Sequence, residues 1–160
     1  MEARLPLIIL IGLLVFTFCF HSTAATTIGG SLKKDLSSES LWYGGFLRTG
    51  GLLKLELGGY KPYSGPASEI KLSSYLLLDL NLGSFGLENG SMHLYLGASP
   101  DMTLNTASRS FSVSSSAAYA KTGLQLNFFP FFVQVQTTGR LKFSGDLTDL
   151  FGSVGIGLTF

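Results

Sequence analysis

Three side chains in the second half of the chain have the types needed for acyl-transfer chemistry. Ser91, His93 and Tyr95 alternate with Met92 and Leu94, so in a strand they would share one face. A serine next to a histidine can act as nucleophile and general base. The competing interpretation is a hydrogen-bonded histidine in the interior of the fold. We prefer the second interpretation and predict no catalytic residue.

Six charged side chains lie on strand faces opposite leucine-rich faces. They are expected to point to the inside of the fold, where they must pair with one another or meet water. Together with His93 they form the predicted interior polar network: Lys54, Glu56, Lys71, Asp79, Arg140 and Lys142. A structural network is the preferred interpretation, and a substrate path is the alternative.

No cofactor, metal or nucleic-acid partner is predicted. Cys19 is the only cysteine, and a single histidine after residue 24 without a carboxylate cluster does not make a metal site. Glycine pairs such as Gly29-Gly30 and Gly58-Gly59 do not open a helix, so they do not match phosphate-binding loops. The net charge of +1 gives no attraction to nucleic acid.

The elements that position these groups are expected to follow an export signal. Arg4 supplies a positive start, and the apolar run 5–20 has about 16 residues, short of the ~20 that a spanning helix needs. Small residues then surround Ala24, which predicts cleavage after it. The expected organisation is a signal peptide, 1–24, and one domain, 25–160. A retained membrane anchor is the alternative.

From Ile28 onward the dominant hydrophobic period is two, which indicates β-strands. The clearest example is 131–143, where valines alternate with glutamines. The stretch 109–128 is too long for one crossing, so a bulge or a hairpin near 118–122 is expected. The predicted strands are 26–34, 41–49, 53–58, 70–82, 91–96, 109–128, 131–143 and 150–160, with a break at Ser99-Pro100-Asp101.

The composition of residues 25–160 favours strands that face lipid. Nineteen of these 136 residues are charged, 14%, where soluble domains carry about 25%. Eight membrane-crossing strands of about 10 residues fit this length, and in lipid the sheet must close. The predicted fold class is therefore all-β, an antiparallel up-and-down transmembrane β-barrel of about eight strands. A secreted soluble barrel or sandwich, with its apolar face turned inward, is the alternative.

The C-terminus carries a motif of its own. In 153–160 a polar residue is followed by glycine and by hydrophobic residues that alternate to a terminal aromatic, the key positions being Ser153, Gly155, Leu158 and Phe160. This motif resembles the assembly signal of bacterial outer-membrane β-barrel proteins, and the chain is similar in size to the small eight-stranded members. The resemblance implies a bacterial outer-membrane location, contact with outer-membrane lipid and recognition by the barrel-assembly machinery.

The expected role is structural or an interaction with the cell envelope, through a narrow, side-chain-filled barrel rather than a large pore. With both termini periplasmic, the outer loops would be 35–40, 61–69, 99–108 and 144–148. One alternative is a lipid-modifying enzyme or a carrier of small hydrophobic molecules. Lipid A acylases and deacylases of this class use histidine with serine, but Met92-His93-Leu94-Tyr95 does not reproduce their local motif.

Overall fold

The computed structural model describes residues 25–64, 69–86, 90–106 and 108–160. The expected signal peptide, 1–24, lies outside the described residues. The strands are β1 (Ala25–Asp35), β2 (Leu41–Gly50), β3 (Leu53–Pro62), β4 (Glu69–Phe85), β5 (Gly90–Asn105), β6 (Ser110–Phe128), β7 (Phe131–Lys142) and β8 (Leu147–Thr159).

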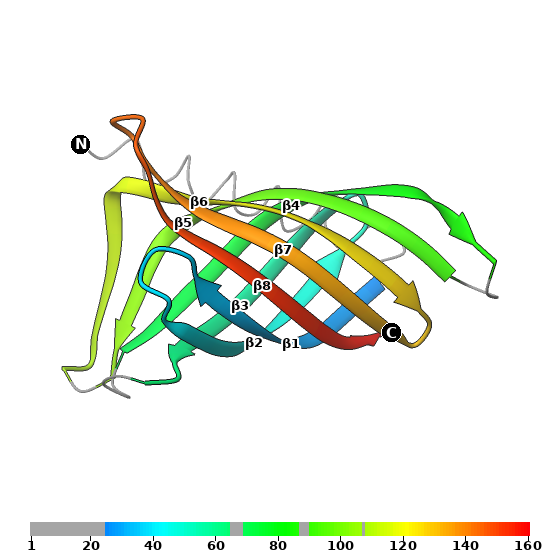
Figure 1. The fold of residues 1–160 in the computed structure, drawn as a ribbon, viewed down its shortest axis with the longest axis horizontal. Coiled ribbons are helices and arrows are strands. Elements are labelled where there is room, and N and C mark those ends of the chain that lie inside the picture. The colour runs from blue at the N-terminus through cyan, green and yellow to red at the C-terminus, as the bar shows by residue number, and fades with distance from the viewer. Residues whose placement is uncertain (1–24, 65–68, 87–89, 107) are drawn as a thin grey trace, which may run out of the picture.

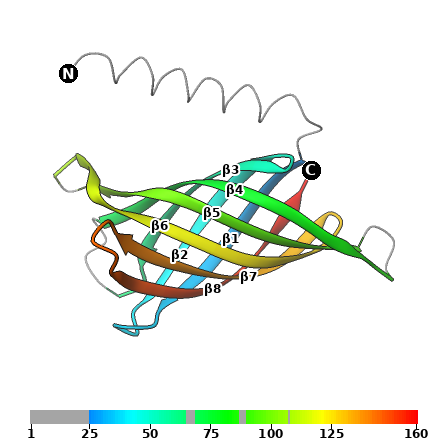
Figure 2. The ribbon, with the colours of Figure 1, turned by 90° about the horizontal axis from the view of Figure 1, so that it is seen from above.

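Each strand pairs antiparallel with the next one, and β1 pairs with β8, so the eight strands form a closed barrel (Figures 1 and 2). Closure gives every strand a neighbour on both sides, although the long strands β4 and β6 extend past β3 and β7, so that residues 80–85 and 110–113 are in register with β5 alone. The predicted fold class, an all-β up-and-down barrel of eight strands, is confirmed. Within the described residues, no helix has the length and apolar character to cross a membrane.

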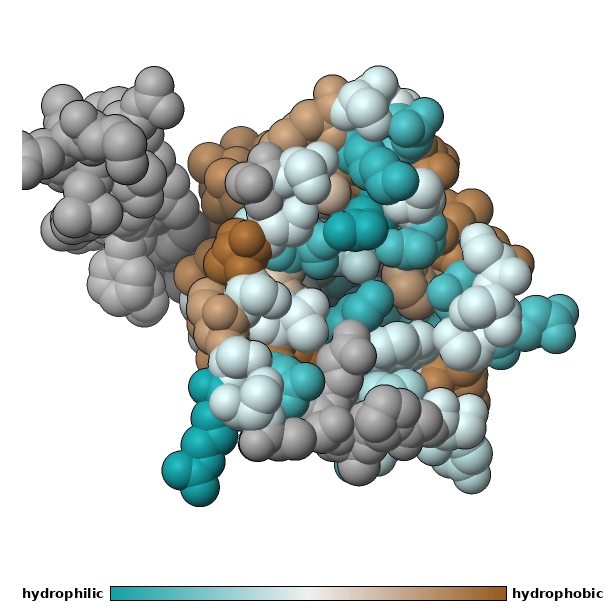
Figure 3. Space-filling view, turned by 90° about the vertical axis from the view of Figure 1, so that its left-hand side faces the viewer, coloured by the Kyte–Doolittle hydropathy of each residue, from teal (hydrophilic) through white to brown (hydrophobic). Residues whose placement is uncertain are grey.

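The two ends of the barrel differ. At the terminus end, the backbones of Thr26 and Phe160 exchange hydrogen bonds of 3.2 and 2.8 Å. The β2–β3, β4–β5 and β6–β7 connections lie at this end too. The other four connections make up the loop end, where hydrophilic side chains gather over the middle while apolar ones show along the flanks (Figure 3).

The outer surface of the barrel is apolar on every strand. Period-two alternation turns one aliphatic series outward, and the exposed fraction reaches 60% at Val135 and 67% at Ile156. Exposed aliphatic residues, one for each strand from β1 to β8, are Ile28, Leu47, Leu57, Leu78, Leu96, Leu124, Val135 and Ile156. Soluble monomers rarely carry so large a continuous apolar surface.

The interior of the barrel is polar and filled. The side chains that alternate with the aliphatic series are fully buried at Arg48, Glu56, Lys121, Gln134 and Gln136. A soluble barrel would bury its leucines and valines here instead. The alternatives of an inward apolar face and of a sandwich are therefore wrong for this chain.

The break expected at Ser99-Pro100-Asp101 is wrong, because β5 continues through it to Asn105. The register shifts between Pro100 and Met102, so the proline, which has no N–H to donate, sits at a bulge. The Ser99 hydroxyl accepts the Ser74 N–H at 3.0 Å. The outer loop expected at 99–108 is therefore shortened to the residues between β5 and β6.

The stretch 109–128 is one strand, β6, and not a hairpin. Met102 pairs with Val113, while Pro100 pairs with Ala118, so one residue of β5 opposes four of β6. Phe111 and Val113 are exposed before this bulge, and Leu124 is exposed after it. The outward-facing residues of β6 therefore change from odd to even positions, as expected, but the change occurs a few residues earlier than predicted.

Candidate functional site

At the centre of the lumen, one carboxylate lies between two cationic side chains. Arg48 and Glu56 lie opposite each other in the β2–β3 hairpin, and their Nη2 and Oε2 atoms are 2.7 Å apart. Lys121 reaches across from β6 and places its Nζ 2.5 Å from the other carboxylate oxygen of Glu56. All three side chains are buried and have lost their hydration. The ion pairs and hydrogen bonds between them must therefore replace the stabilisation that water would give each charge.

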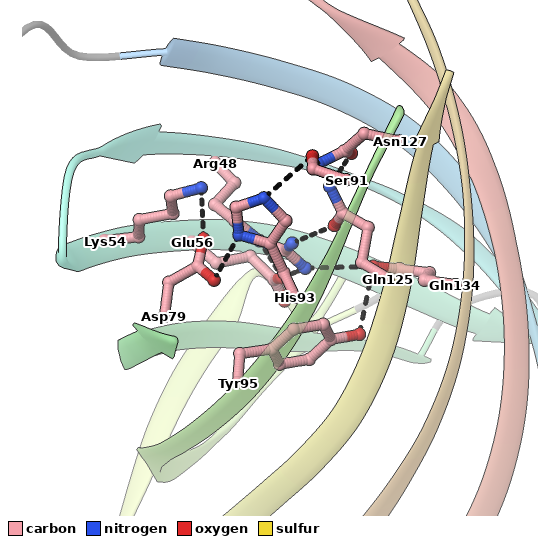
Figure 4. A network of polar contacts seen from close by, with 10 residues as sticks. All are labelled: Arg48, Lys54, Glu56, Asp79, Ser91, His93, Tyr95, Gln125, Asn127 and Gln134. Carbon is pink, nitrogen blue, oxygen red and sulfur yellow. Dashed lines mark hydrogen bonds and ion pairs between the residues drawn. The ribbon is translucent and has the colours of Figure 1, made fainter. Parts of the chain in front are cut away.

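Amide side chains extend this cluster to the opposite wall. Arg48 donates to the Oε1 atoms of Gln125 at 2.6 Å and Gln134 at 3.0 Å. The Tyr95 hydroxyl lies within hydrogen-bond distance of Gln134 and Gln136, and the Arg48 guanidinium stacks 4.6 Å above the Tyr95 ring. These contacts join β2, β3, β5, β6 and β7 across the interior (Figure 4).

Glycines in the wall give these long side chains their space. A Cβ atom on Gly123 would lie 2.6 Å from the Tyr95 hydroxyl, and one on Gly155 would lie 2.8 Å from the Gln134 amide nitrogen. Both distances are shorter than a van der Waals contact allows. The side chains of Tyr95 and Gln134 are therefore packed directly against the backbone of the wall at this level.

A second polar cluster lies toward the terminus end, as Figure 4 shows. Lys54 forms an ion pair with Asp79, whose Oδ1 is 2.9 Å from Nδ1 of His93. Nε2 of His93 is 3.1 Å from the Ser91 hydroxyl, which also accepts a hydrogen bond of 3.1 Å from the Asn127 amide. The order of groups is thus carboxylate, imidazole, hydroxyl, which is the arrangement of an activated serine.

Among the described residues, the hydrogen bond between Gln125 and Asn127 joins the two clusters. Gln125 donates to Asn127 at 2.6 Å and accepts from Arg48, so it links the Ser91 side to the Glu56 side. A continuous chain of polar contacts therefore runs from Lys54 at the mouth to Lys121 in the centre.

Arg140 belongs to a separate group at the loop end. Its guanidinium binds the Asp101 carboxylate at 2.6 Å and lies 3.7 Å from that of Asp149. Lys71 places its ammonium over the Trp42 ring at 4.9 Å and makes no ion pair with any described residue. Lys142 departs from the expectation, because it is exposed at the last position of β7.

The structure thus brings Lys54, Asp79 and His93 together and places Glu56 nearby, while Lys71 and Arg140 lie elsewhere in the lumen. Two residues central to the network, Arg48 and Lys121, are absent from the predicted set. The signal for Arg48 was the tight turn at 50–53, which sets β2 and β3 in a register that places Arg48 opposite Glu56. No such signal exists for Lys121, because the bulge in β6 hides which face of the strand this residue occupies.

The residues of the C-terminal motif, which the sequence predicts to be an assembly signal, lie on β8 and just beyond it. Ser153 and Gly155 are buried toward the lumen, whereas the ring of Phe160 is 68% exposed. Among the described residues, no group of three or more histidine, cysteine or acidic side chains is placed to hold a metal ion.

Aromatic residues near the strand ends divide between the two faces. Phe129 and Phe131 are exposed on the outer surface at the terminus end, where an interfacial ring of aromatics is expected. Tyr60 and Phe132 are buried instead, with exposed fractions of 3% and 1%, so they pack the lumen.

A closed eight-stranded sheet with an aliphatic exterior and an ion-paired interior has the fold of small transmembrane β-barrels. No model of a known protein family matches the chain, and no curated protein matches it. Solved structures do match. The N-terminal β-barrel domain of OprF from Pseudomonas aeruginosa is similar at 17% identity and a TM-score of 0.59, covering 85% of this chain and 97% of that one.

A de novo designed transmembrane β-barrel is similar at 11% identity and a TM-score of 0.60, covering 85% of this chain and 95% of the design. A second design, TMB2.3, is 12% identical with a TM-score of 0.50, over 84% of this chain and 92% of its own. At these identities the likeness concerns the fold alone.

Proposed function

We propose that residues 25–160 form an integral β-barrel of a bacterial outer membrane, with a structural or envelope-interaction role and no solute path. The observation that carries this proposal is the division of side chains between an aliphatic outer surface on all eight strands and a buried network around Glu56. The likeness to the OprF barrel domain supports the bacterial setting.

The barrel would reach this membrane through its last strand. The positions Ser153, Gly155, Leu158 and Phe160 are proposed to be read by the barrel-assembly machinery. With the termini in the periplasm, the segments 36–40, 63–68, 106–109 and 143–146 would face outward. They are short, which favours contact with lipid headgroups or a neighbouring envelope component over a large receptor surface.

Cell fractionation combined with conductance tests this proposal. The protein should appear in the outer-membrane fraction and migrate faster on gels before heating than after it. The refolded protein should produce no stepwise conductance in a planar bilayer. Recovery in the aqueous periplasmic fraction without detergent would reject the membrane location, and steady channel currents would reject the filled lumen.

A second candidate function is hydrolysis of acyl esters, and the contacts of Ser91 with His93 favour it. A hollow of about 400 Å³ beside Ser91 is also lined by Asn127, Phe129 and Phe131. The exposed phenylalanines could hold an acyl chain, while the Asn127 amide could donate to a developing oxyanion. A lipid with a fatty-acyl ester is therefore the substrate class that this hollow fits.

The chemistry balances without a cofactor. With Nδ1 protonated toward Asp79, Nε2 of His93 takes the Ser91 proton while Oγ bonds to the ester carbonyl carbon. The bond from that carbon to the alcohol oxygen breaks, and the alcohol leaves with the proton from His93. Water then attacks the acyl-serine in the same way and releases the fatty acid.

A fluorophosphonate probe and a medium-chain p-nitrophenyl ester test this candidate on the refolded barrel. Labelling and hydrolysis should be lost in Ser91→Ala and kept in Ser84→Ala, a matched control at the exposed position opposite Ser91 on β4. An unlabelled wild-type protein that is fully folded would reject ester hydrolysis and leave the structural proposal standing.

A further inference from the structure

The loop-end half of the lumen contains two lysines that form no ion pair with a described carboxylate. Lys33 on β1 is 7% exposed and Lys71 on β4 is partly buried. Within the described part of the chain, neither forms an ion pair with a carboxylate. Their ammonium groups instead face aromatic rings, Lys33 over Tyr60 at 3.3 Å and Lys71 over Trp42 at 4.9 Å.

The buried acids of the described interior are already engaged. Glu56 gives one oxygen to Arg48 and the other to Lys121. Asp79 binds Lys54 and His93, and Asp101 binds Arg140. The lumen therefore carries more buried positive charge than its own carboxylates neutralise, and a buried cation needs a counter-charge or water.

A cavity of about 30 Å³ lies between the two lysines. Its wall also includes Ser73 and Thr138, whose hydroxyl oxygens are buried and have no hydrogen-bond partner among the described residues. No acidic side chain lines it. This volume exceeds the ~10–15 Å³ needed for one water molecule but is too small for an acyl chain or a nucleotide.

We propose that this cavity is a binding site for a small inorganic anion of the size of chloride. Such an anion would neutralise Lys33 and Lys71 and accept hydrogen bonds from the Ser73 and Thr138 hydroxyls. Aromatic rings line much of the same cavity, and such low-dielectric surroundings strengthen the charge interaction. The site lies at the opposite end of the lumen from Ser91, and its occupancy is independent of any chemistry there.

Unfolding of the refolded barrel in sodium chloride and in sodium gluconate at equal ionic strength tests this site, because gluconate is too large for the cavity. Ligand that binds only the folded state raises the unfolding midpoint with concentration. Chloride should raise the midpoint above its value in gluconate. Line broadening of the ³⁵Cl resonance by the folded protein gives a second measure that does not depend on unfolding.

Lys33→Gln should weaken chloride binding about tenfold or more, the loss expected for a hydrogen bond to a charged group. Lys34→Gln is the matched control, because its side chain is exposed at the next position of β1. Ser73→Ala tests the same site with a smaller change and should also weaken binding. Equal midpoints in the two salts, or an unchanged chloride response in both Lys33→Gln and Ser73→Ala, would overturn the proposal.

Discussion

Replacing Glu56 by glutamine removes the negative charge that Arg48 and Lys121 share. The glutamine keeps an oxygen that can accept from Arg48, but its NH₂ group would face the Lys121 ammonium, so a donor meets a donor. The volume of the side chain is nearly unchanged. The perturbation therefore tests charge and hydrogen bonding rather than packing.

The expected loss follows from the burial of the three side chains. Both cations lose their ion pairs, of 2.7 and 2.5 Å, in a place where water cannot replace them. Removal of one partner from a buried ion pair costs about 3–5 kcal/mol. Since barrels of this size are stabilised by about 5–15 kcal/mol, the variant should lose a large part of its free energy of unfolding.

Urea unfolding in phosphatidylcholine vesicles measures this free energy, with fluorescence of Trp42, the single tryptophan, as the signal. Glu39→Gln is the matched control, because Glu39 is exposed in the β1–β2 connection, and it should behave as wild type. In Glu56→Gln combined with Lys121→Gln, the loss should be smaller than the sum of the two single losses, because the unpaired cation is gone.

A loss below about 1 kcal/mol in Glu56→Gln would refute the reasoning, because it lies within the range of an ordinary neutral hydrogen bond. Additive losses in the double variant would do so as well. Either result would mean that water reaches the centre of the lumen and that the interior is not filled.

Three further predictions concern the wall. Gly44→Ala should destabilise the barrel by about 1–3 kcal/mol in the same assay, because its Cβ would lie 2.1 Å from the carbonyl oxygen of Gly59, whereas Gly30→Ala, with nothing closer than 3.7 Å, should be tolerated. Val135→Lys should cost about 2–4 kcal/mol if this outward position lies near the bilayer midplane, whereas a neutral result would argue against contact with lipid. Phe160→Ala should slow assembly, seen as a smaller heat-modifiable fraction at early times, and wild-type kinetics would contradict a role in the assembly signal.

The strands and the faces of β7 and β8 could be predicted from the sequence, because valine or isoleucine alternates there with glutamine or glycine. The inward face of β2 could not be predicted, because large apolar residues lie at both even and odd positions of this strand: Trp42, Tyr43, Phe46 and Leu47. Arg48 was missed for this reason. Pro100 was misassigned because a proline ends a regular strand but is accepted at a bulge.

The predicted network contained Lys54, Glu56, Asp79 and His93 but not the way in which they pair. Neighbours on adjacent strands follow from turn lengths. Partners across the lumen depend on the tilt and curvature of the whole sheet, which no local pattern encodes. Lys121 and Glu56, from strands that are not neighbours, are an example.

The partners in the central network are far apart along the chain, at separations of 65 residues for Lys121 and Glu56 and 86 for Arg48 and Gln134. The β2–β3 hairpin pairs Arg48 with Glu56, but the partners Lys121 and Gln134 come from β6 and β7. In an incomplete sheet, the side chains of Glu56 and Arg48 would be exposed to water. Pairing of β1 with β8 closes the barrel and excludes water from them. The barrel should therefore resist dissection into shorter fragments and should gain or lose its structure in a single concerted event.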